Sequence, residues 1–145
     1  MAFFLPNFSD ELSFIKLVVD SFYDKAKSDI IIGYHFRHID DFDVHLPKIH
    51  LFWAVQLLDL DSSQKKALLN KANLNSIIKK HEYLKIKKGE VGRWVLLFQS
   101  SIEENFSKIH NEEKREKLEV LKNQMTKKTE LFHRVFLNSK SLFKN

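Results

Sequence analysis

Histidine and aromatic side chains alternate within residues 34–53, YHFRHIDDFDVHLPKIHLFW, which hold four of the chain's seven histidines. Imidazole groups beside apolar surface can bind a metal ion, form part of a nucleic-acid surface or line a cofactor pocket. A zinc site would need three or four converging ligands at tight spacing, and neither that spacing nor an HExxH pattern is present. The sequence therefore disfavours zinc as the purpose of these histidines, which are His35, His38, His45 and His50.

Other reaction classes also lack their sequence patterns. There is no G-x-S-x-G, and the three glycines of the chain form neither a phosphate-binding loop nor a dinucleotide-binding loop. The net charge of +5 could indicate an anionic partner, but the lysines alternate with acids in segments such as NEEKREKLEVLK, as they do on solvated helix faces. We therefore expect no nucleic-acid partner, and we keep a basic nucleic-acid-binding bundle only as a remote alternative.

The size of the chain predicts one domain over residues 1–145, because 145 residues with 43% hydrophobic content can build a single core. No cysteine is present, which excludes disulfides and thiolate metal ligands and fits a reducing compartment. The start, MAFFLPNFSDEL, does not look like a signal peptide, and no apolar run is long enough to span a bilayer. We therefore expect a cytoplasmic protein with no membrane partner.

Few residues that break helices occur in the chain, which has three glycines and two prolines. Long stretches without either residue favour helices, so the sequence predicts an all-α fold. Ser9 is expected to cap a first helix that runs to about residue 27, with Phe14, Leu17, Val18 and Phe22 in its apolar stripe.

Four more helices are expected along the chain. Asp41 or Asp43 can cap the second, which begins within a few residues of position 45 and ends near 58. A third, polar helix begins at position 62 or 63, and Gly89 and Gly92 are expected to flank a loop before the fourth, over 94–109. Asn111 is expected to cap a long last helix.

Two histidines lie on apolar helix faces of this pattern, His45 on the second helix and His81 after the third. A single histidine on such a face is usually a core residue with a hydrogen-bond partner. Two of them on separate helices, each flanked by aromatic residues, raise the alternative that they enclose a haem.

The sequence resembles the truncated haemoglobins, and within them the third group. Three segments carry the resemblance, and the middle one is the most specific because its acid–acid–aromatic–x–x–His run ends in Phe-Trp, as in the distal helix of that group. The resemblance covers most of residues 10–109 and is weak over the last helix. The segments are LVVDSFYDKAKSD (17–29), IDDFDVHLPKIHLFWAVQLL (39–58) and HEYLKIKKGEVGRWVLLFQSSIEENF (81–106).

The resemblance implies how a b-type haem, iron protoporphyrin IX, would be held without a covalent bond. His81 matches the proximal histidine that bonds the iron, and Phe36 matches a phenylalanine that packs flat on the haem. Phe52 is a further expected haem contact. Because Lys48 follows His45 by three residues on one helix, it is expected near a haem propionate.

The resemblance also implies a distal, ligand-binding side. Tyr23 matches the distal tyrosine whose hydroxyl hydrogen-bonds a ligand on the iron, and Phe22 precedes it. His45 matches the distal-helix histidine of the group, and Trp94 matches a tryptophan whose indole N–H faces the same pocket. His35, His38 and His50 have no role in the family pattern and are expected to be surface or packing residues.

The connection before His81 departs from the family pattern, because DLDSSQKKALLNKANLNS replaces the usual glycine-rich link. Its lysines and leucines follow an amphipathic pattern, which predicts an additional helix within residues 62–72, outside the haem pocket. His81 remains the expected iron ligand because it precedes Trp94 at about the family distance.

The resemblance thus implies a single-domain truncated globin, a two-over-two helical sandwich with an extra helix and a long C-terminal helix. It would be monomeric, and its pentacoordinate haem iron would bind dioxygen, NO or CO. A peroxidase-like or nitric oxide-detoxifying enzyme, served by an unknown reductase, is the alternative function. A cofactor-free helical adaptor is a more remote alternative.

Overall fold

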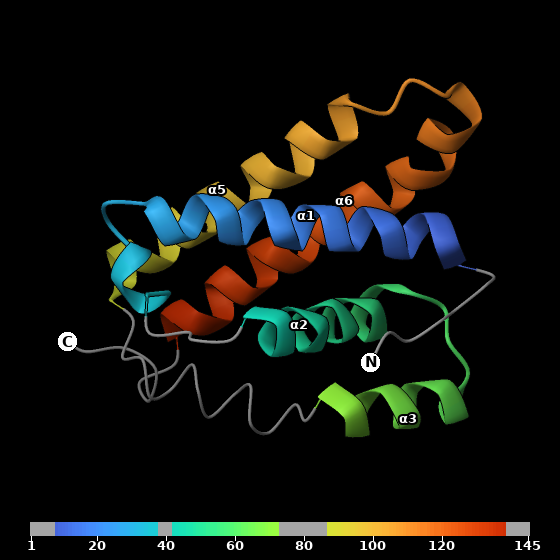
Figure 1. Ribbon diagram of the computed structural model, residues 1–145, viewed down its shortest axis with the longest axis horizontal. Helices are drawn as coiled ribbons and strands as arrows, with labels where there is room; N and C mark the ends of the chain where they lie inside the picture. The colour runs from blue at the N-terminus through green and yellow to red at the C-terminus, as the bar shows by residue number, and fades with distance from the viewer. Residues whose placement is uncertain (1–7, 38–41, 73–86, 139–145) are drawn as a thin grey trace.

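The computed structural model describes residues 8–37, 42–72 and 87–138, and these residues form helices and their connections without a strand. This confirms the prediction of an all-α fold. The helices, coloured along the chain in Figure 1, are α1 (Ser9–Ser28), the short 3-10 helix η2 (Gly33–His35), α2 (Phe42–Leu57), α3 (Ser62–Ala72), α5 (Lys88–Ser107) and α6 (Glu112–Asn138).

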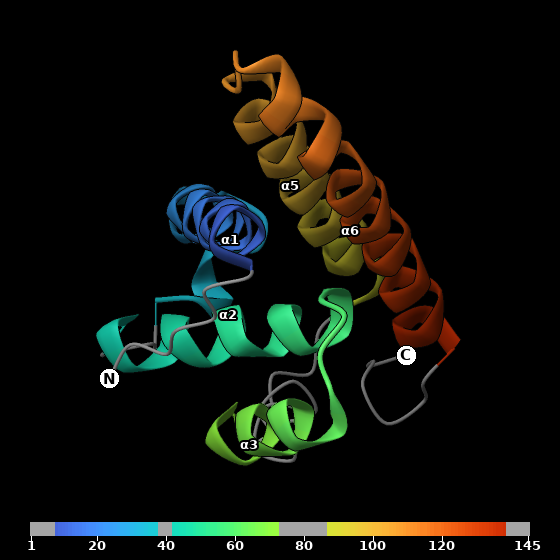
Figure 2. The ribbon, with the colours of Figure 1, turned by 90° about the vertical axis from the view of Figure 1, so that its right-hand side faces the viewer.

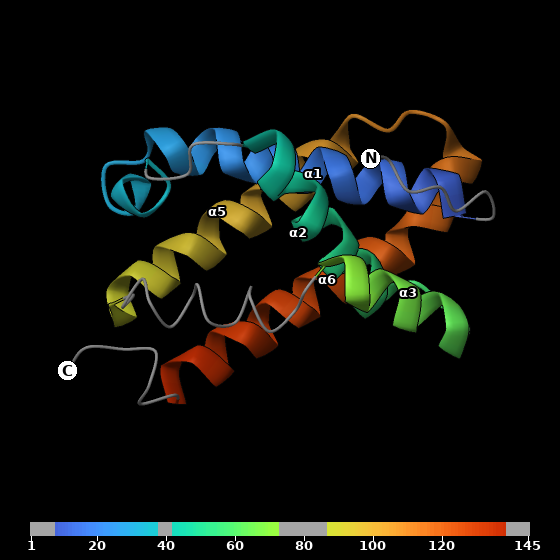
Figure 3. The same cartoon turned by 60° about the horizontal axis from the view of Figure 1, so that its bottom comes forward.

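Two long helices, α5 and α6, run side by side as a hairpin, and α1 and α2 lie against them (Figures 2 and 3). The short α3 packs on α2, on the side away from α1. The C-terminal end of α1, η2 and the start of α5 meet at one end of the molecule, at the left of Figure 1. The residues of the expected distal site therefore converge near this end.

The core lies between α1, α5 and α6, where Ile15, Val18, Ile102, Leu118 and Met125 are almost completely buried. Complete burial of one such side chain contributes roughly 1.5–3 kcal/mol, so this apolar layer is the main stabilising element of the bundle.

The apolar stripe of α1 differs in one position from the predicted stripe. Phe14, Val18 and Phe22 are buried as predicted, but the side chain of Leu17 is 55% exposed. The buried arc is centred on the side of Ile15 and neighbouring apolar positions, so Leu17 lies beyond its edge. Periodicity alone had placed Leu17 on the stripe because it follows Phe14 by three residues.

The helix boundaries confirm some of the predicted caps and correct others. The backbone N–H of Lys114 donates to the Asn111 side chain at 2.9 Å, which confirms Asn111 as a cap. Helix α1 begins at Ser9, but the residue before it is Phe8 and no side chain caps that end, so the predicted Ser9 cap is wrong. The alternative cap Asp43 lies in the first turn of α2, and position 41 is outside the described residues.

The extra helix predicted within 62–72 is present as α3. Its start is capped reciprocally, because the backbone N–H of Gln64 donates to the Asp61 carboxylate at 2.7 Å and the backbone N–H of Asp61 donates to the Gln64 side chain at 3.1 Å.

The predicted loop flanked by Gly89 and Gly92 is not a loop, because both glycines lie inside α5. A Cβ atom at either position would meet no atom within 4 Å, so neither glycine is required by crowding. Helix α5 begins at Lys88 instead, where the Glu90 carboxylate accepts a hydrogen bond from the backbone N–H of Lys87 at 2.8 Å. This capping contact outweighs the weak helix preference of two glycines.

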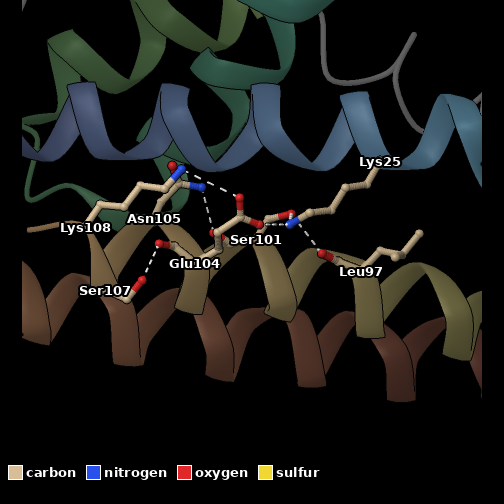
Figure 4. Close-up of polar contacts among 7 residues, drawn as sticks. All are labelled: Lys25, Leu97, Ser101, Glu104, Asn105, Ser107 and Lys108. Atoms are coloured by element: carbon tan, nitrogen blue, oxygen red, sulfur yellow. Dashed lines mark hydrogen bonds and ion pairs between the residues drawn. The ribbon is translucent and has the colours of Figure 1, made fainter.

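Helix α1 is fastened to α5 by the polar group drawn in Figure 4. The Lys25 ammonium forms an ion pair with Glu104 and donates to the Ser101 hydroxyl at 3.2 Å. Ser101 in turn donates to the Leu97 carbonyl at 2.9 Å, so its hydroxyl is satisfied although the residue is fully buried. These contacts set the position of α1 along α5 two residues from Tyr23.

No helix in the described ranges is long and apolar enough to cross a membrane.

Candidate functional site

A tyrosine and a histidine from different helices meet at the centre of the expected distal site. The Tyr23 hydroxyl, on α1, and the His45 Nε2 atom, on α2, share a hydrogen bond of 3.0 Å. Tyr23 is buried and His45 is half-buried. The two residues are 22 positions apart in the sequence, so the fold brings together the two expected distal hydrogen-bonding groups.

Aromatic rings from four further positions surround this pair. The Tyr23 ring meets the rings of Phe36 at 5.4 Å and Phe42 at 5.9 Å between centroids, both edge to face. Trp94 lies 4.9 Å from Phe36 and stacks on Phe22 at 6.2 Å. Edge-to-face and offset contacts of this kind are the favoured arrangements of aromatic pairs.

Burial determines the protonation state of the central phenol. The pKa of Tyr23 is raised far above its ordinary value of 10.0, because burial removes the water that would stabilise a phenolate. Tyr23 therefore keeps its proton throughout the physiological range and remains a hydrogen-bond donor.

The cluster presents a largely apolar surface to its surroundings. Phe22, Tyr23 and Phe36 are buried, whereas His45 and Trp94 are only half-buried and pack against the core with part of their surface accessible. The His45 imidazole and the Trp94 indole are therefore the groups of the cluster that a flat apolar macrocycle such as haem could contact in this arrangement. In the described part of the chain, no group of three or more His, Cys, Asp or Glu residues could hold a bare metal ion.

The other expected haem contacts lie along α2 or outside the described residues. Lys48 is half-buried, about one turn from His45. Phe52 lies further along α2 and packs on Trp53 and Phe132, with ring centroids 5.9 and 5.8 Å away. The expected iron ligand, His81, and the histidine at 38 fall outside the described residues.

An open depression of about 310 Å³ lies between α2 and α6, at a different place from the aromatic cluster. Its lining consists of Gln56, Leu57, Gln124, Lys127, Lys128 and Leu131. It offers neither a histidine nor an aromatic ring, so it is not the expected haem site.

Sequence reasoning missed a buried polar group beside Trp94. The Glu90 carboxylate accepts hydrogen bonds from the Tyr34 hydroxyl and, through its other oxygen, from the His35 Nε2 at 3.2 Å. His35 and Glu90 are both buried, and the His35 ring lies 6.4 Å from Trp94. The expectation that His35 is a surface or packing residue holds only as packing, because its ring is enclosed.

Glu90 stays ionised in this enclosed position. Burial by itself would raise the pKa of Glu90, but hydrogen bonds from Tyr34, from the backbone of Lys87 and from His35 together hold that pKa below its ordinary value. Burial and the Glu90 carboxylate raise the pKa of Tyr34 to about 12, so Tyr34 remains a donor. Glu90 therefore joins η2 to the start of α5.

A second buried carboxylate, that of Asp29 at the end of α1, also forms hydrogen bonds to α5. It accepts from Arg93 Nε at 2.9 Å and Nη2 at 2.7 Å, and from the backbone N–H groups of Ile31 at 2.9 Å and Ile32 at 3.1 Å. The hydrogen bonds from Arg93 are the main cause that lowers the pKa of Asp29. Asp29 and Glu90 together hold the turn that carries Phe36 against the helix that carries Trp94.

Asp29→Asn is expected to weaken the fold in a pH-dependent manner. A carboxyl whose pKa is lowered by folding stabilises the protein above its ordinary value of 3.8 and loses that effect as the pH falls through the lowered pKa. The loss at pH 7 should be about 1 kcal/mol, because Arg93 remains partly open to solvent, which screens the pair. Urea unfolding at pH 7 and at pH 3 measures it, and the difference between variant and wild type should shrink at pH 3. An equal difference at both pH values would contradict this role.

His50 occupies a third buried position. Its Nε2 pairs with the Asp20 carboxylate at 2.8 Å, and burial lowers the pKa of His50 despite that carboxylate. His50 is thus a packing residue between α2 and α1, in agreement with its expected role.

No protein-family model matches the chain, and no curated protein or solved structure is significantly similar to it.

Proposed function

We propose that the chain is a haem protein of the truncated-globin type that binds dioxygen or another diatomic ligand. The observation that supports this most is the 3.0 Å contact between Tyr23 and His45 inside an aromatic cluster that also contains Phe36 and Trp94. Tyr23 lies on α1, His45 on α2 and Trp94 on α5, while Phe36 directly follows η2, and the family resemblance gives each of them a role beside the haem. An all-α packing that joins them by chance would have no reason to select this set.

The shared hydrogen bond determines which proton is available to a ligand. If Nε2 of His45 carries a hydrogen, it donates to the Tyr23 oxygen, and the phenolic hydrogen remains free to point into the pocket. If Nε2 is unprotonated, Tyr23 donates to it and has no second hydrogen to offer. The first tautomer therefore makes Tyr23 the donor to a ligand and His45 the group that orients it.

A bound haem would supply the open iron coordination site at which a diatomic molecule binds. The chain contributes the surroundings. Phe22, Phe36 and Trp94 exclude water from the distal side, which strengthens any hydrogen bond made there. Tyr23 holds its proton because of burial, and the Trp94 indole N–H is a second donor to a ligand with partial negative charge.

Tyr23→Phe is expected to release dioxygen faster from the haem-loaded protein. The substitution keeps the ring and its edge contacts and removes only the hydroxyl, so it should cost about 1–3 kcal/mol of ligand stabilisation, which corresponds to an increase of roughly 5- to 150-fold in the off-rate. Carbon monoxide carries less negative charge and should be affected less. Stopped-flow or flash-photolysis rates for both ligands measure this.

Tyr34→Phe is the matched control for that variant, because it also removes a tyrosine hydroxyl, but one that donates to Glu90 and not to His45. It should leave the dioxygen off-rate within about twofold of wild type. Equal changes for dioxygen and carbon monoxide in Tyr23→Phe would assign Tyr23 a packing role instead.

The open coordination site can be tested directly. The haem-loaded protein, reduced under argon and then exposed to carbon monoxide, should show an immediate shift of the Soret band. A Soret band that does not change would mean that side chains occupy both axial positions, which would overturn the proposal of a ligand-binding iron.

A peroxidase-like activity is a second candidate, favoured by the same pair of polar side chains. A phenol and an imidazole in hydrogen-bond contact could accept and donate the proton that cleavage of a peroxide requires, if a bound haem supplied the redox chemistry. Peroxide-dependent oxidation of a phenolic dye by the haem-loaded protein should then fall by tenfold or more, on the order of general acid–base effects, in His45→Leu. Unchanged turnover in that variant would remove this candidate.

A further inference from the structure

The turn after α1 exposes large apolar side chains at one end of the molecule. Ile30 is 95% exposed, Ile31 is 50% exposed and Tyr34 is 42% exposed, whereas Ile32 between them is completely buried. We call Ile30, Ile31 and Tyr34 the isoleucine tip. Single exposed apolar residues are ordinary on protein surfaces, but three within five positions of one turn form a concentrated patch.

The turn that carries the tip is held in place by many hydrogen bonds. The Asp29 carboxylate accepts from the backbone N–H groups of Ile31 and Ile32 and from Arg93, and the Asp29 carbonyl accepts from the backbone N–H of Gly33 at 2.9 Å. Tyr34 is held by Glu90.

Gly33 lets the turn approach the end of α1, since a Cβ atom there would lie 3.0 Å from the Lys27 carbonyl oxygen. Ile30 is therefore presented to solvent by a rigid turn and not by a loose segment.

Cationic side chains surround the tip on the elements that meet there. Lys27 ends α1, Arg37 follows η2, and Lys87 and Lys88 begin α5; all four are exposed. Lys87 is adjacent to the tip, because its backbone N–H bonds the same Glu90 that holds Tyr34.

The acidic groups at this end of the described chain are few. Asp29 and Glu90 are buried and hydrogen-bonded, and two acids are exposed: Asp24, which lies 3.7 Å from Lys27, and Asp43, which follows the Phe42 ring on which Lys27 rests. Among the described residues around the tip, four exposed cations therefore stand against two exposed acids.

We propose that the isoleucine tip docks on the surface of an anionic lipid bilayer. Apolar side chains at the summit of a turn can enter the headgroup and acyl boundary, while a ring of lysine and arginine binds anionic headgroups. A protein partner is a weaker fit, because the apolar groups stand out from a turn and are surrounded by cationic side chains. No membrane partner was expected because no segment is long enough to span a bilayer. Docking at the bilayer surface does not require such a segment.

This docking is independent of haem, and the experiment uses the full chain without added haem. Sedimentation with vesicles of phosphatidylcholine and phosphatidylserine should remove most of the protein from the supernatant at low salt. Vesicles of phosphatidylcholine alone, or high salt, should remove at least fivefold less. Ile30→Asp combined with Ile31→Asp should abolish binding to the anionic vesicles.

Two variants complete the test. Lys87→Glu combined with Lys88→Glu should weaken binding to the anionic vesicles at least fivefold. Val120→Asp is the matched control, because Val120 is 61% exposed on α6, away from the tip, and should bind like wild type. Circular dichroism checks that each variant is folded.

The proposal is overturned if wild type does not sediment with anionic vesicles, or if Ile30→Asp with Ile31→Asp sediments as wild type does. A concentration-dependent dimer that these substitutions dissociate, without vesicle binding, would assign the tip to a second copy of the chain and would also overturn it.

Discussion

His81→Ala is expected to lose most of its haem, and added imidazole is expected to restore part of it. The variant removes the only side chain that the proposal assigns to the iron, while the aromatic cluster around Tyr23 stays intact. A free imidazole can then enter the space left by the side chain and ligate the iron. The haem content after gel filtration, read from the Soret band, measures both effects. We expect a loss of tenfold or more in haem affinity, on the order of the cost of losing a metal-site contact.

His110→Ala is the control for this variant, because His110 is exposed in the connection between α5 and α6. It should retain haem as wild type does. Full haem retention and an unchanged Soret band in His81→Ala would show that a side chain other than His81 ligates the iron.

Phe98→Ala should cost about 3–5 kcal/mol of unfolding free energy, the usual range for removing a buried aromatic ring. Phe98 is buried on α5, where its ring lies 5.3 Å from Phe22 and 4.9 Å from Trp53 between centroids. It therefore joins α5 to both α1 and α2, and its loss leaves a cavity where three helices meet. Because an entire domain is stable by only about 5–15 kcal/mol, the variant should be marginal at room temperature. Urea unfolding followed by circular dichroism measures the change.

Leu96→Ala serves as the comparison, because Leu96 lies on the same helix and is 56% exposed. Its unfolding free energy should change by no more than about 0.5 kcal/mol. A similar loss in both variants would mean that Phe98 does not fill the junction between the helices.

The scarcity of glycine and proline was enough to predict the all-α class, and the amphipathic spacing of lysines and leucines was enough to predict the extra helix α3, because such signals act within a few residues. Sequence-based prediction was wrong where another contact outweighed a local preference. Gly89 and Gly92 suggested a loop, but the carboxylate of Glu90 caps the first turn of α5 and the helix continues through both. Leu17 was predicted to be buried, but the core packs against the neighbouring arc of α1 and Leu17 is exposed.

The polar contacts that hold the site together could not be predicted from the sequence. Asp29 and Arg93 are 64 positions apart, and His35 and Glu90 are 55 apart, so no local spacing connects them. Glu90 could have been noticed only as the third residue after a possible helix start, a pattern that many surface glutamates share. His35 was expected to be a surface or packing residue because the family pattern gives it no role, and its hydrogen bond to this distant partner could not be predicted from the sequence.

The distal set is the part of the candidate site for which the sequence was most informative. Tyr23, His45 and Trp94 were assigned from a family resemblance, and they lie in one aromatic cluster together with Phe22 and Phe36. Lys48 and Phe52, which lie on the same helix as His45, were expected to contact a haem. These two contacts remain predictions, as does the bond from His81 to the iron.

Titration of the purified chain with haemin tests the central proposal most directly. Haemin added in small steps should produce a Soret band that rises linearly and stops at one equivalent per chain, and the same titration of His81→Ala should show no such end point. A Soret band that rises without saturation, as haemin does in the presence of a protein that binds it only at its surface, would contradict the proposal and identify the aromatic cluster as the core of a helical protein without a cofactor.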